Sequence, residues 1–552
     1  MSSQEDSIYR PLHRGKACLY CRRRKTKCDG AKPTCRSCRM AGRLQECEYT
    51  DQGPALTQVL EDEVDRLKAR IYDLEHPTDN LPVTLHNPHA AYLEAQTRRT
   101  SRPDIRNQPN ERHSSSSGSV GSLLLRQMHP EVSRMLVTLF VERGELTGFA
   151  LDKSRFYEQF NLPASNPNSP HPALLSSIYV WAFRLLNSNA FSGILPLYVN
   201  EAKRALASTI NHRSSHARIQ AIQSQVLLAA FFYSNGRVVE GHYHATGAVT
   251  MSFSAGLHRE LASSAGSPSS SPNLAPGTML SIPPPRDAIE AAERTRLFWA
   301  VYTLDACWSV AAGSSSNIRE GGNPNTTIKT PWPLSNEEFR SRSLSQSVAS
   351  GNIIQEFLSN PSAMQGGRYT SSITLRAQAS VLLKLATRLG ESSNSDDTQR
   401  GMNEFRDMAR FVSSFIDNLP SINGQSELES VILMTNLVTR SLAHTAEIHL
   451  HVGRLGSIPG SLTACVNSAL AILDIMEHIV AEESDLMDPA IVVSWTAAAR
   501  IFVWNGHGAP SSLKKTCNTA ASRLRSSLTA IIQICPMMET QVRSVLDVLS
   551  GN

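Results

Sequence analysis

Six cysteines in the thirty positions from Cys18 to Cys47 constrain the fold of this chain more than any other feature. They follow the spacing C-x2-C-x6-C-x6-C-x2-C-x8-C, so that two C-x-x-C pairs are each followed by a single cysteine further along. A C-x-x-C pair lets two thiolates reach one metal ion from a single turn, and zinc prefers closed tetrahedral sites of four sulfur ligands in a reducing compartment. The spacing therefore predicts a small module held together by zinc.

Six thiolates can give two zinc ions four ligands each only if two cysteines are shared. If Cys18 and Cys35 are the shared pair, one ion is held by Cys18, Cys21, Cys28 and Cys35, and the other by Cys18, Cys35, Cys38 and Cys47. Both sites are then closed and keep no open position for catalysis. We expect two structural zinc ions.

Two other uses of these cysteines are weaker hypotheses. Six cysteines could form disulfides in fifteen ways, but the opening MSSQEDSIYRPLHRGK has no apolar secretion signal, so we expect a reducing compartment. A cross-braced zinc site of the RING type would need histidine ligands and longer spacing, and the nearby histidine is His13. The remaining cysteines are dispersed, and we expect them to be small core residues: Cys307, Cys465, Cys517 and Cys535.

Positive charge is concentrated around the same cysteines. From Arg10 to Cys47 there are twelve Lys or Arg residues against Asp29 and Glu46, a local charge of +10, whereas the whole chain carries +5. Phosphate backbones attract such a cluster at long range and release counterions on contact. The asymmetry predicts a polyanion-binding module attached to a mildly acidic body.

The stretch RRRKTK between Cys21 and Cys28 contains the densest run of cations. We expect it to form a short helix with its ends fixed by the metal-binding cysteines and an outer surface that is almost wholly positive. Lys and Arg can bond guanine O6 and N7 in the major groove, while neighbouring cations neutralise phosphates. The expected partner is double-stranded DNA; the alternatives are a solvated basic face or a nuclear import signal by itself.

The segment CLYCRRRKTKCDGAKPTCRSC, together with Cys47, resembles the fungal binuclear zinc cluster of transcription factors, both in cysteine spacing and in the Lys32-Pro33 loop. The resemblance implies that Pro33 shapes a loop between two pseudo-symmetric halves. It further implies a nuclear, sequence-specific regulator of RNA polymerase II transcription that works with the transcription machinery.

The same resemblance implies a division of roles among the cations. Lys25 would read a CGG-type triplet through the major groove, and Arg22 and Lys27 would anchor phosphates. Arg23 and Arg24 would assist.

A heptad pattern over residues 57–75 predicts a coiled coil. Position a holds Thr57, Val64 and Ile71, and position d holds Leu60, Leu67 and Leu74. β-Branched a and leucine d positions favour parallel two-stranded coils, and Glu63 would face Lys68 of a partner while Arg70 would face Glu75. We expect a homodimer reading paired triplets; the alternative is that this helix packs on its own regulatory body.

The chain as a whole is expected to be mostly α-helical. The expected segments are a disordered tail (1–14), the zinc cluster (15–50), a linker with the coiled coil (51–77), a disordered linker (78–122) and a large all-helical regulatory domain (123–552) with disordered inserts near 262–285 and 313–351. Helical periodicity is clear in HPALLSSIYVWAFRLL, where Leu174, Ile178, Trp181, Ala182 and Leu185 share one face. The apolar stretch Ala490 to Trp504 is too short to span a bilayer and contains Arg500, so we expect a buried helix and no membrane partner.

Two stretches resemble the fungal transcription factor regulatory domain. Val226 to Arg259 pairs two apolar helices around SNGR, and Ala291 to Gly313 is similar to that family's arginine, aromatic and aspartate helix. The Gly-Arg-Pro that usually follows this helix is Gly313-Ser314-Ser315 here, so the loop geometry after it is left open. We expect the aromatic residues of this helix to be core residues: Trp299, Tyr302 and Trp308.

Nothing in the sequence indicates an enzyme. No phosphate-binding loop, nucleophile elbow or dinucleotide fingerprint is present, and the histidines at 242, 244, 444, 449 and 451 lack a metalloprotease pattern. A metal-structured adaptor that meets other proteins is the rival among binding proteins, and a catalytic site hidden in the helical body is the rival among enzymes. A small-molecule effector of the regulatory domain is left open.

Overall fold

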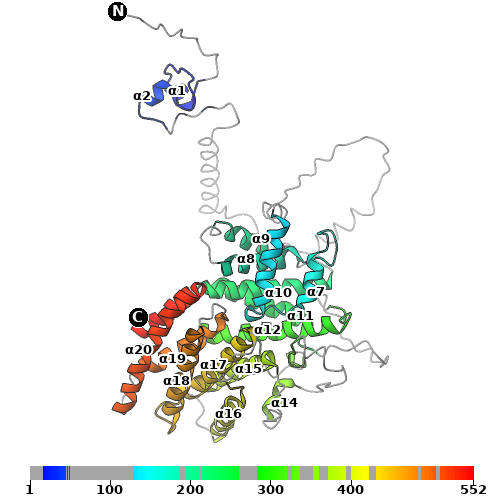
Figure 1. The fold of residues 1–552 in the computed structure, drawn as a ribbon, viewed down its shortest axis with the longest axis vertical. Helices are drawn as coiled ribbons and strands as arrows, with labels where there is room; N and C mark the ends of the chain where they lie inside the picture. Colours follow the sequence, from blue (N-terminus) through cyan, green and yellow to red (C-terminus); the bar gives the residue numbers. More distant parts are fainter. Residues whose placement is uncertain are drawn as a thin grey trace, which may run out of the picture. The chain divides into compact units, whose positions relative to one another are not determined.

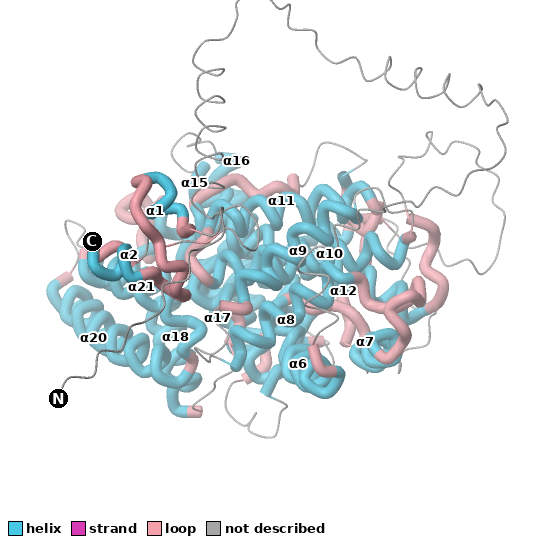
Figure 2. The backbone as a smooth tube through the Cα atoms, turned by 90° about the horizontal axis from the view of Figure 1, so that it is seen from above, coloured by secondary structure: helices cyan, strands magenta, loops and turns pink. Residues whose placement is uncertain are grey.

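The computed structural model describes residues 17–44, 47, 49, 128–186, 193–209, 214–259, 282–319, 326–335, 352–359, 371–392, 399–421, 430–482, 487–504 and 510–551. Every regular element in these ranges is a helix, as the sequence predicts (Figure 2). The chain divides into two compact units, residues 1–114 and 115–552, which are described separately. The predicted coiled coil over 57–75, the tail and the linker at 78–122 lie outside the described residues.

The described part of the N-terminal unit contains two short helices, α1 (Leu19–Arg23) and α2 (Arg36–Met40). Each begins directly after the first cysteine of a C-x-x-C pair, and that cysteine is the N-cap whose sulfur accepts a hydrogen bond from the backbone N–H of the second cysteine. Helices of five residues are not stable by themselves in water. Their stability must therefore come from the sulfur cluster that joins them.

The C-terminal unit is a helical body (Figure 1). Its first part comprises α6 (Pro130–Arg143), η1 (Gly144–Thr147), α7 (Lys153–Phe160), α8 (Pro172–Leu186), α9 (Leu195–Thr209), α10 (Ser215–Ser234), α11 (Val238–Ser254) and α12 (Ala288–Ala312). Its second part comprises α14 (Ile353–Ser359), α15 (Ser372–Glu391), α16 (Gln399–Asn418), α17 (Ser430–Val452), α18 (Ser461–Ala481), η6 (Pro489–Ile491), α19 (Val492–Val503), α20 (Ser511–Ile534), η7 (Pro536–Met538) and α21 (Glu539–Ser550).

Consecutive helices pack against each other in the first part, α8 with α9 and α10 with α11. The predicted face of α8 is buried, with Leu174, Ile178, Trp181 and Ala182 fully inaccessible and Leu185 partly buried. The Trp181 indole N–H donates to the carbonyl of Leu227 at 2.9 Å, which fixes α8 on α10. The helix pair predicted around SNGR is confirmed, because α10 ends at Ser234 and α11 begins at Val238.

The long helix α12 links the two parts, because it contacts α10 and α11 on one side and α15 and α19 on the other. Trp299, Tyr302 and Trp308 are buried in it, as predicted. The Trp299 N–H donates to the carbonyl of Pro331 at 2.7 Å, and its ring stacks on Trp332 with centroids 4.3 Å apart. All three are core residues, and Trp299 holds the loop at 326–335 against the helix.

The loop after α12 corrects part of the expectation that residues 313–351 form a disordered insert. The buried Asp305 carboxylate accepts hydrogen bonds from the backbone N–H of Asn317 and of Ile318, both at 3.1 Å. Ile318 and Ile328 are 2% exposed. Segment 313–319 therefore packs on the body, because an aspartate in the preceding helix satisfies its backbone donors. Segment 326–335 packs there through other contacts, such as the Lys329 N–H that donates to the His258 carbonyl at 2.8 Å. The composition-based prediction did not include that partner.

The second part of the body is built around α17, which packs on α15, α18 and α19. The predicted buried helix within 490–504 is confirmed as α19, with Arg500 on its exposed side. By length and composition, α18 is the described helix that could cross a bilayer, but 50% of its most apolar window is buried in the body. All four dispersed cysteines are buried, as expected of small core residues: Cys307, Cys465, Cys517 and Cys535.

Candidate metal centre and nucleic-acid interface

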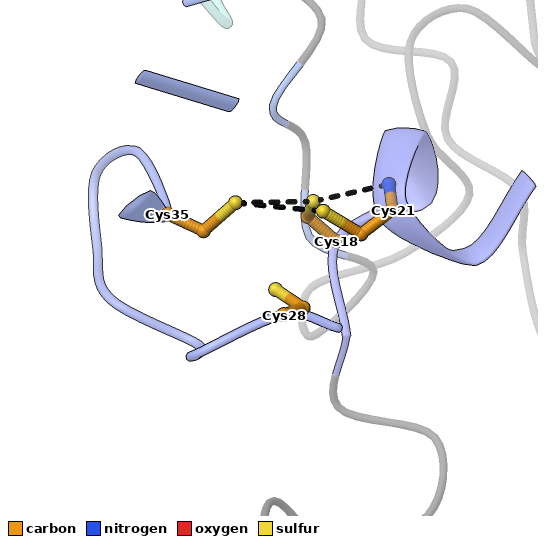
Figure 3. Close-up of side chains that lie close together, drawn as sticks. All are labelled: Cys18, Cys21, Cys28 and Cys35. Atoms are coloured by element: carbon orange, nitrogen blue, oxygen red, sulfur yellow. Dashed lines mark hydrogen bonds between the residues drawn. The ribbon is translucent and has the colours of Figure 1, made fainter. Parts of the chain in front are cut away.

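The six predicted cysteines lie together in the N-terminal unit. The Cys18 sulfur lies 3.8 Å from that of Cys35, and the Cys21 sulfur lies 3.6 Å from that of Cys35 (Figure 3). The Cys18 sulfur also lies 3.7 Å from that of Cys38. Two quartets have all their sulfur atoms within 4.8 Å of one another: Cys18, Cys21, Cys28 and Cys35, and Cys18, Cys35, Cys38 and Cys47. Cys18 and Cys35 belong to both, as the sequence-based hypothesis proposed.

These spacings fit zinc. A Zn–S bond of about 2.3 Å in a tetrahedral site places two sulfur ligands about 3.8 Å apart. Measured sulfur–sulfur distances of 3.6 to 3.8 Å between members of one quartet agree with that value. Four of the six cysteines are fully inaccessible to solvent: Cys18, Cys21, Cys35 and Cys38. The donor set is thus suited to two closed, four-sulfur zinc sites.

The thiol pKa values show why the cluster needs cations. Burial raises the pKa of Cys18, Cys21 and Cys38 above the ordinary thiol value. Burial also acts to raise the pKa of Cys35, but hydrogen bonding, led by the Cys38 N–H that donates to its sulfur, lowers it overall. Because buried thiolates are costly alone, metal ions must supply the compensating charge that keeps the ligands deprotonated.

The two halves of the module repeat one backbone design at a separation of 17 residues. The Cys21 N–H donates to the Cys18 sulfur at 3.5 Å, and the Cys38 N–H donates to the Cys35 sulfur at 3.3 Å. At the helix ends, the N–H of Thr26 donates to the carbonyl of Cys21 at 3.0 Å, and the N–H of Arg43 donates to that of Cys38 at 2.9 Å. The pseudo-symmetry implied by the family resemblance is therefore present in the backbone.

Both helices end through a residue in the left-handed region, Lys25 with φ of 54° in the first half and Gly42 with φ of 66° in the second. Lys25 is the one non-glycine residue with positive φ among the described residues. The prediction that RRRKTK forms one short helix is wrong, since α1 begins at Leu19 and ends at Arg23. The left-handed turn at Lys25 cannot continue a right-handed helix, so Thr26 and Lys27 extend away from it.

The loop between the halves is held by residues that the sequence analysis did not select. Asp29 accepts from the backbone N–H of Arg36 at 3.0 Å, and the Ser37 hydroxyl donates to the carbonyl of Lys27 at 2.6 Å. The Tyr49 hydroxyl donates to the carbonyl of Ala31 at 3.0 Å. Asp29 lies seven residues before the first residue of α2, whose N-cap is Cys35, so no local helix-start pattern in the sequence would have found it.

All six residues from 22 to 27 are exposed, so the predicted cationic surface exists. The Arg24 guanidinium lies over the Tyr20 ring, 5.6 Å from its centroid, and Arg22 donates to the carbonyl of Ala17 at 3.4 Å. Arg23, Lys25 and Lys27 complete the surface. The structure thus brings the five predicted DNA-contacting residues onto one short segment attached to the sulfur cluster.

Comparison with known families gives two matches. Residues 16–55 match the fungal Zn(2)-Cys(6) binuclear cluster domain, and residues 149–445, just over half of the chain, match the fungal specific transcription factor domain. The chain belongs to this fungal transcription factor family. It is a zinc-cluster transcription regulator that binds DNA and holds two zinc ions. A comparison with curated proteins finds no match.

The histidines of this zinc-cluster regulator do not form a second site within the described residues, where the cysteine quartets are the groups able to hold a metal. His244 is 3% exposed, its Nδ1 lies 2.5 Å from Gln225 Oε1, and its ring stacks on Phe232. His444 Nδ1 lies 3.1 Å from the Ser468 hydroxyl. Burial lowers the pKa of both histidines to about 4, so they are neutral core residues. Both matching families are transcription factor domains and not enzymes.

Proposed function

We propose that this chain is a nuclear regulator of RNA polymerase II transcription that reads CGG-type triplets in the DNA major groove. The observation that supports it most is the mounting of six consecutive exposed residues, five of them cationic, directly on a closed sulfur cluster. Because the sulfur cluster is a rigid support for these flexible cationic side chains, it lowers the entropy cost of placing one of them at the edge of a DNA base.

Lys25 is the proposed reading residue. Its left-handed backbone turns the chain immediately after α1, and its side chain is exposed. Arg22 and Lys27 are the proposed phosphate anchors, and Arg23 and Arg24 assist. Phosphate contacts set the docking angle, whereas a base-edge contact provides specificity.

All six cysteines are the proposed zinc ligands, with Cys18 and Cys35 shared. The two ions, when bound, neutralise the thiolates and lock the halves together, and every contact to DNA is made by the protein's own side chains. Cys18→Ser should abolish binding of both ions, whereas Cys47→Ser should leave one quartet intact. Native mass spectrometry under reducing conditions distinguishes the two, and equal loss of metal in both variants would contradict the sharing of Cys18.

We further propose that two chains pair through the heptads at 57–75 and present two clusters to paired triplets. The proposal rests on the a, d, e and g residues of that segment, because it lies outside the described residues. Specific duplexes with two triplets should bind two chains, which analytical ultracentrifugation of the complex would show.

The DNA-reading proposal is tested by selecting binding sites from random duplexes with the zinc-loaded full chain, followed by two matched lysine variants. Lys25→Ala should relax the triplet preference, at a cost of about 1–3 kcal/mol for the preferred site. Lys27→Ala should weaken all duplexes similarly and reduce the salt slope by about one phosphate. Lys515→Ala, exposed on α20 of the body, is the control. Identical effects of the first two variants would refute the division of roles.

A further inference from the structure

The start of α2 is hydrogen-bonded across the zinc module to the chain at the end of the cationic segment, residues 22–27. The Ser37 hydroxyl donates to the backbone carbonyl of Lys27 at 2.6 Å. Beside it, the Asp29 carboxylate accepts from the backbone N–H of Arg36 at 3.0 Å. We call these two hydrogen bonds the α2 brace. The brace joins the second half of the module to the first without using a cysteine.

The brace acts where the backbone of the cationic segment is no longer helical. α1 ends before Lys25, which turns the chain through a left-handed conformation. The N–H of Thr26 donates to the Cys21 carbonyl at 3.0 Å and ties this turn back to α1. Lys27 then lies outside any regular element, and its carbonyl is held by Ser37. The segment is therefore fixed at its start by α1 and at its end by the brace.

The place of this end matters because lysine side chains are long and flexible. Such a side chain reaches a base edge or a phosphate accurately only when its backbone is held in place by surrounding contacts. A displacement of about 1 Å is enough to lose much of the function of a preorganised site. Lys25 and Lys27 lie on either side of Thr26, so a hydrogen bond at Lys27 restrains the backbone of both lysines.

The charge of Asp29 indicates that its hydrogen bond is needed. Asp29 is exposed and lies two residues after Lys27. A carboxylate beside a surface that meets DNA lowers affinity, because the phosphates repel it. The backbone N–H of Arg36 that it accepts gives this carboxylate a structural use that offsets the repulsion.

The 17-residue repeat of the module shows that the brace serves one half. By that repeat, Ser37 corresponds to Tyr20 and Lys27 corresponds to Leu44. Among the residues that the structure describes, no hydrogen bond joins Tyr20 to Leu44. The first half has five cations at 22–27, whereas the second has two at 39–44. The half with the dense cations is thus the half that is braced.

We propose that Ser37 and Asp29 are positioning residues of the DNA interface. Through the α2 brace, the second half of the module fixes the backbone from which Lys25 and Lys27 reach the duplex. Neither Ser37 nor Asp29 has to contact DNA for this role. The inference rests on the proposed function and gives the second half a part in recognition besides its part in holding zinc.

The test measures affinity of the zinc-loaded full chain for a triplet duplex and for a scrambled duplex at one salt concentration. Ser37→Ala should lower the ratio of the two affinities about fivefold, because one partly exposed hydrogen bond is lost. Ser37→Thr keeps a hydroxyl and should restore the ratio. Met40→Ala, at an 82% exposed position of the same helix, is the control and should keep it. The salt slope should stay the same in all three, because no phosphate contact is removed.

Two variants separate the hydrogen bond of Asp29 from its charge. Asp29→Asn removes the charge but keeps an acceptor oxygen, so it should bind both duplexes more tightly at an unchanged ratio. Asp29→Ala removes the charge and the acceptor, so it should bind both more tightly at a lower ratio. Equal ratios in these two variants would overturn the role of Asp29.

Zinc retention distinguishes positioning from a general loss of stability. Native mass spectrometry should find two zinc ions in Ser37→Ala, and a graded chelator should remove them as it does from the unaltered chain. A zinc loss that parallels the fall in the ratio would overturn the proposal, as would a Ser37→Ala ratio equal to that of the unaltered chain. An unaltered chain that does not prefer the triplet duplex would overturn the proposed function, and this inference with it.

Discussion

The zinc module and the helical body of this regulator are stabilised in different ways. The buried hydrophobic residues described in the module are four cysteines, and its helices have five residues each. The body contains a continuous core that includes Trp181, Trp299 and Trp495. One chain thus combines a unit folded by metal coordination with a unit folded by burial of apolar surface.

The two regions also use cations differently. In the module the residues from Arg22 to Lys27 are all exposed. In the body, Arg294 is 1% exposed, pairs with Glu290 at 2.5 Å and donates to the Pro283 carbonyl at 2.7 Å. Arg155 likewise pairs with Asp287 at 2.6 Å. The cations that are available to a polyanion therefore lie in the zinc module, which has little hydrophobic core. Arg155 and Arg294 of the body instead fix the start of α12.

The largest expected difference between the regions follows metal removal. A chelator should abolish specific duplex binding, because about 10 kcal/mol or more of coordination free energy holds such modules folded. All six tryptophans lie after residue 180, so tryptophan fluorescence reports on the body alone. The midpoint of thermal unfolding of the body should not change when the chelator is added. A parallel loss of body stability would show that the two units depend on each other.

A substitution at a close helix contact should destabilise the body and leave the zinc module unchanged. A Cβ added at Gly390 of α15 would lie 2.1 Å from the backbone carbonyl oxygen of His449 on α17. Because neither backbone can yield cheaply, Gly390→Ala should destabilise the body by about 3 kcal/mol, as overpacking does. Chemical denaturation followed by tryptophan fluorescence measures it.

Gly193→Ala is the control for that variant, since nothing lies within 4 Å of its added Cβ. Zinc content should be unchanged in both variants. A Gly390→Ala chain as stable as the control would mean that α15 and α17 can separate without cost.

Acid should weaken the body through its buried histidines. Burial lowers the pKa of His244, His444 and His449 from 6.5 to about 4. Between these values the unfolded chain binds protons that the folded chain does not, so the stability present above pH 6.5 is lost as the pH falls towards 4. Each histidine contributes up to about 1.4 kcal/mol per pH unit.

Denaturation midpoints between pH 7 and 4.5 measure this slope. His244→Gln should reduce the slope, and His242→Gln, at an exposed position of the same helix, should leave it as it is. An unchanged slope in the His244 variant would remove that histidine from the explanation.

The smallest effect concerns the two halves of the module. Lys25→Gly gives the first half the residue type that the second half has at Gly42, and should stabilise the module by about 1 kcal/mol because glycine accepts positive φ without strain. Gly42→Ala should cost a similar amount through backbone strain alone, since no atom lies within 4 Å of its added Cβ. Resistance of bound zinc to a graded chelator measures both changes.

Measuring specific duplex binding by these two variants separates the role of the backbone turn from that of the Lys25 side chain. Lys25→Gly should lose triplet preference despite its higher stability, whereas Gly42→Ala should keep it. Retained preference in Lys25→Gly would show that the turn, and not the ammonium group, serves recognition.

Sequence reasoning succeeded where the determining constraint is local. The spacing of Cys18, Cys21, Cys35 and Cys38 predicted which sulfurs meet, because chelation from one turn depends on a few neighbouring residues. Periodicity predicted the buried face of α8 for the same reason. The prediction of a helix over RRRKTK was wrong, because the amino-acid sequence does not show that Lys25 adopts the left-handed conformation that ends α1.

The sequence by itself determined the sulfur quartets, the cationic segment and the helical character of the body, because ligand spacing, charge and periodicity are written over short stretches. Tertiary structure alone decided that Asp305 holds the loop at 317–318 and that Arg376 meets Asp488 at the edge of a hollow. Those partners are brought together by the packing of whole helices. Such packing depends on the shape of many side chains at once, which no local pattern encodes.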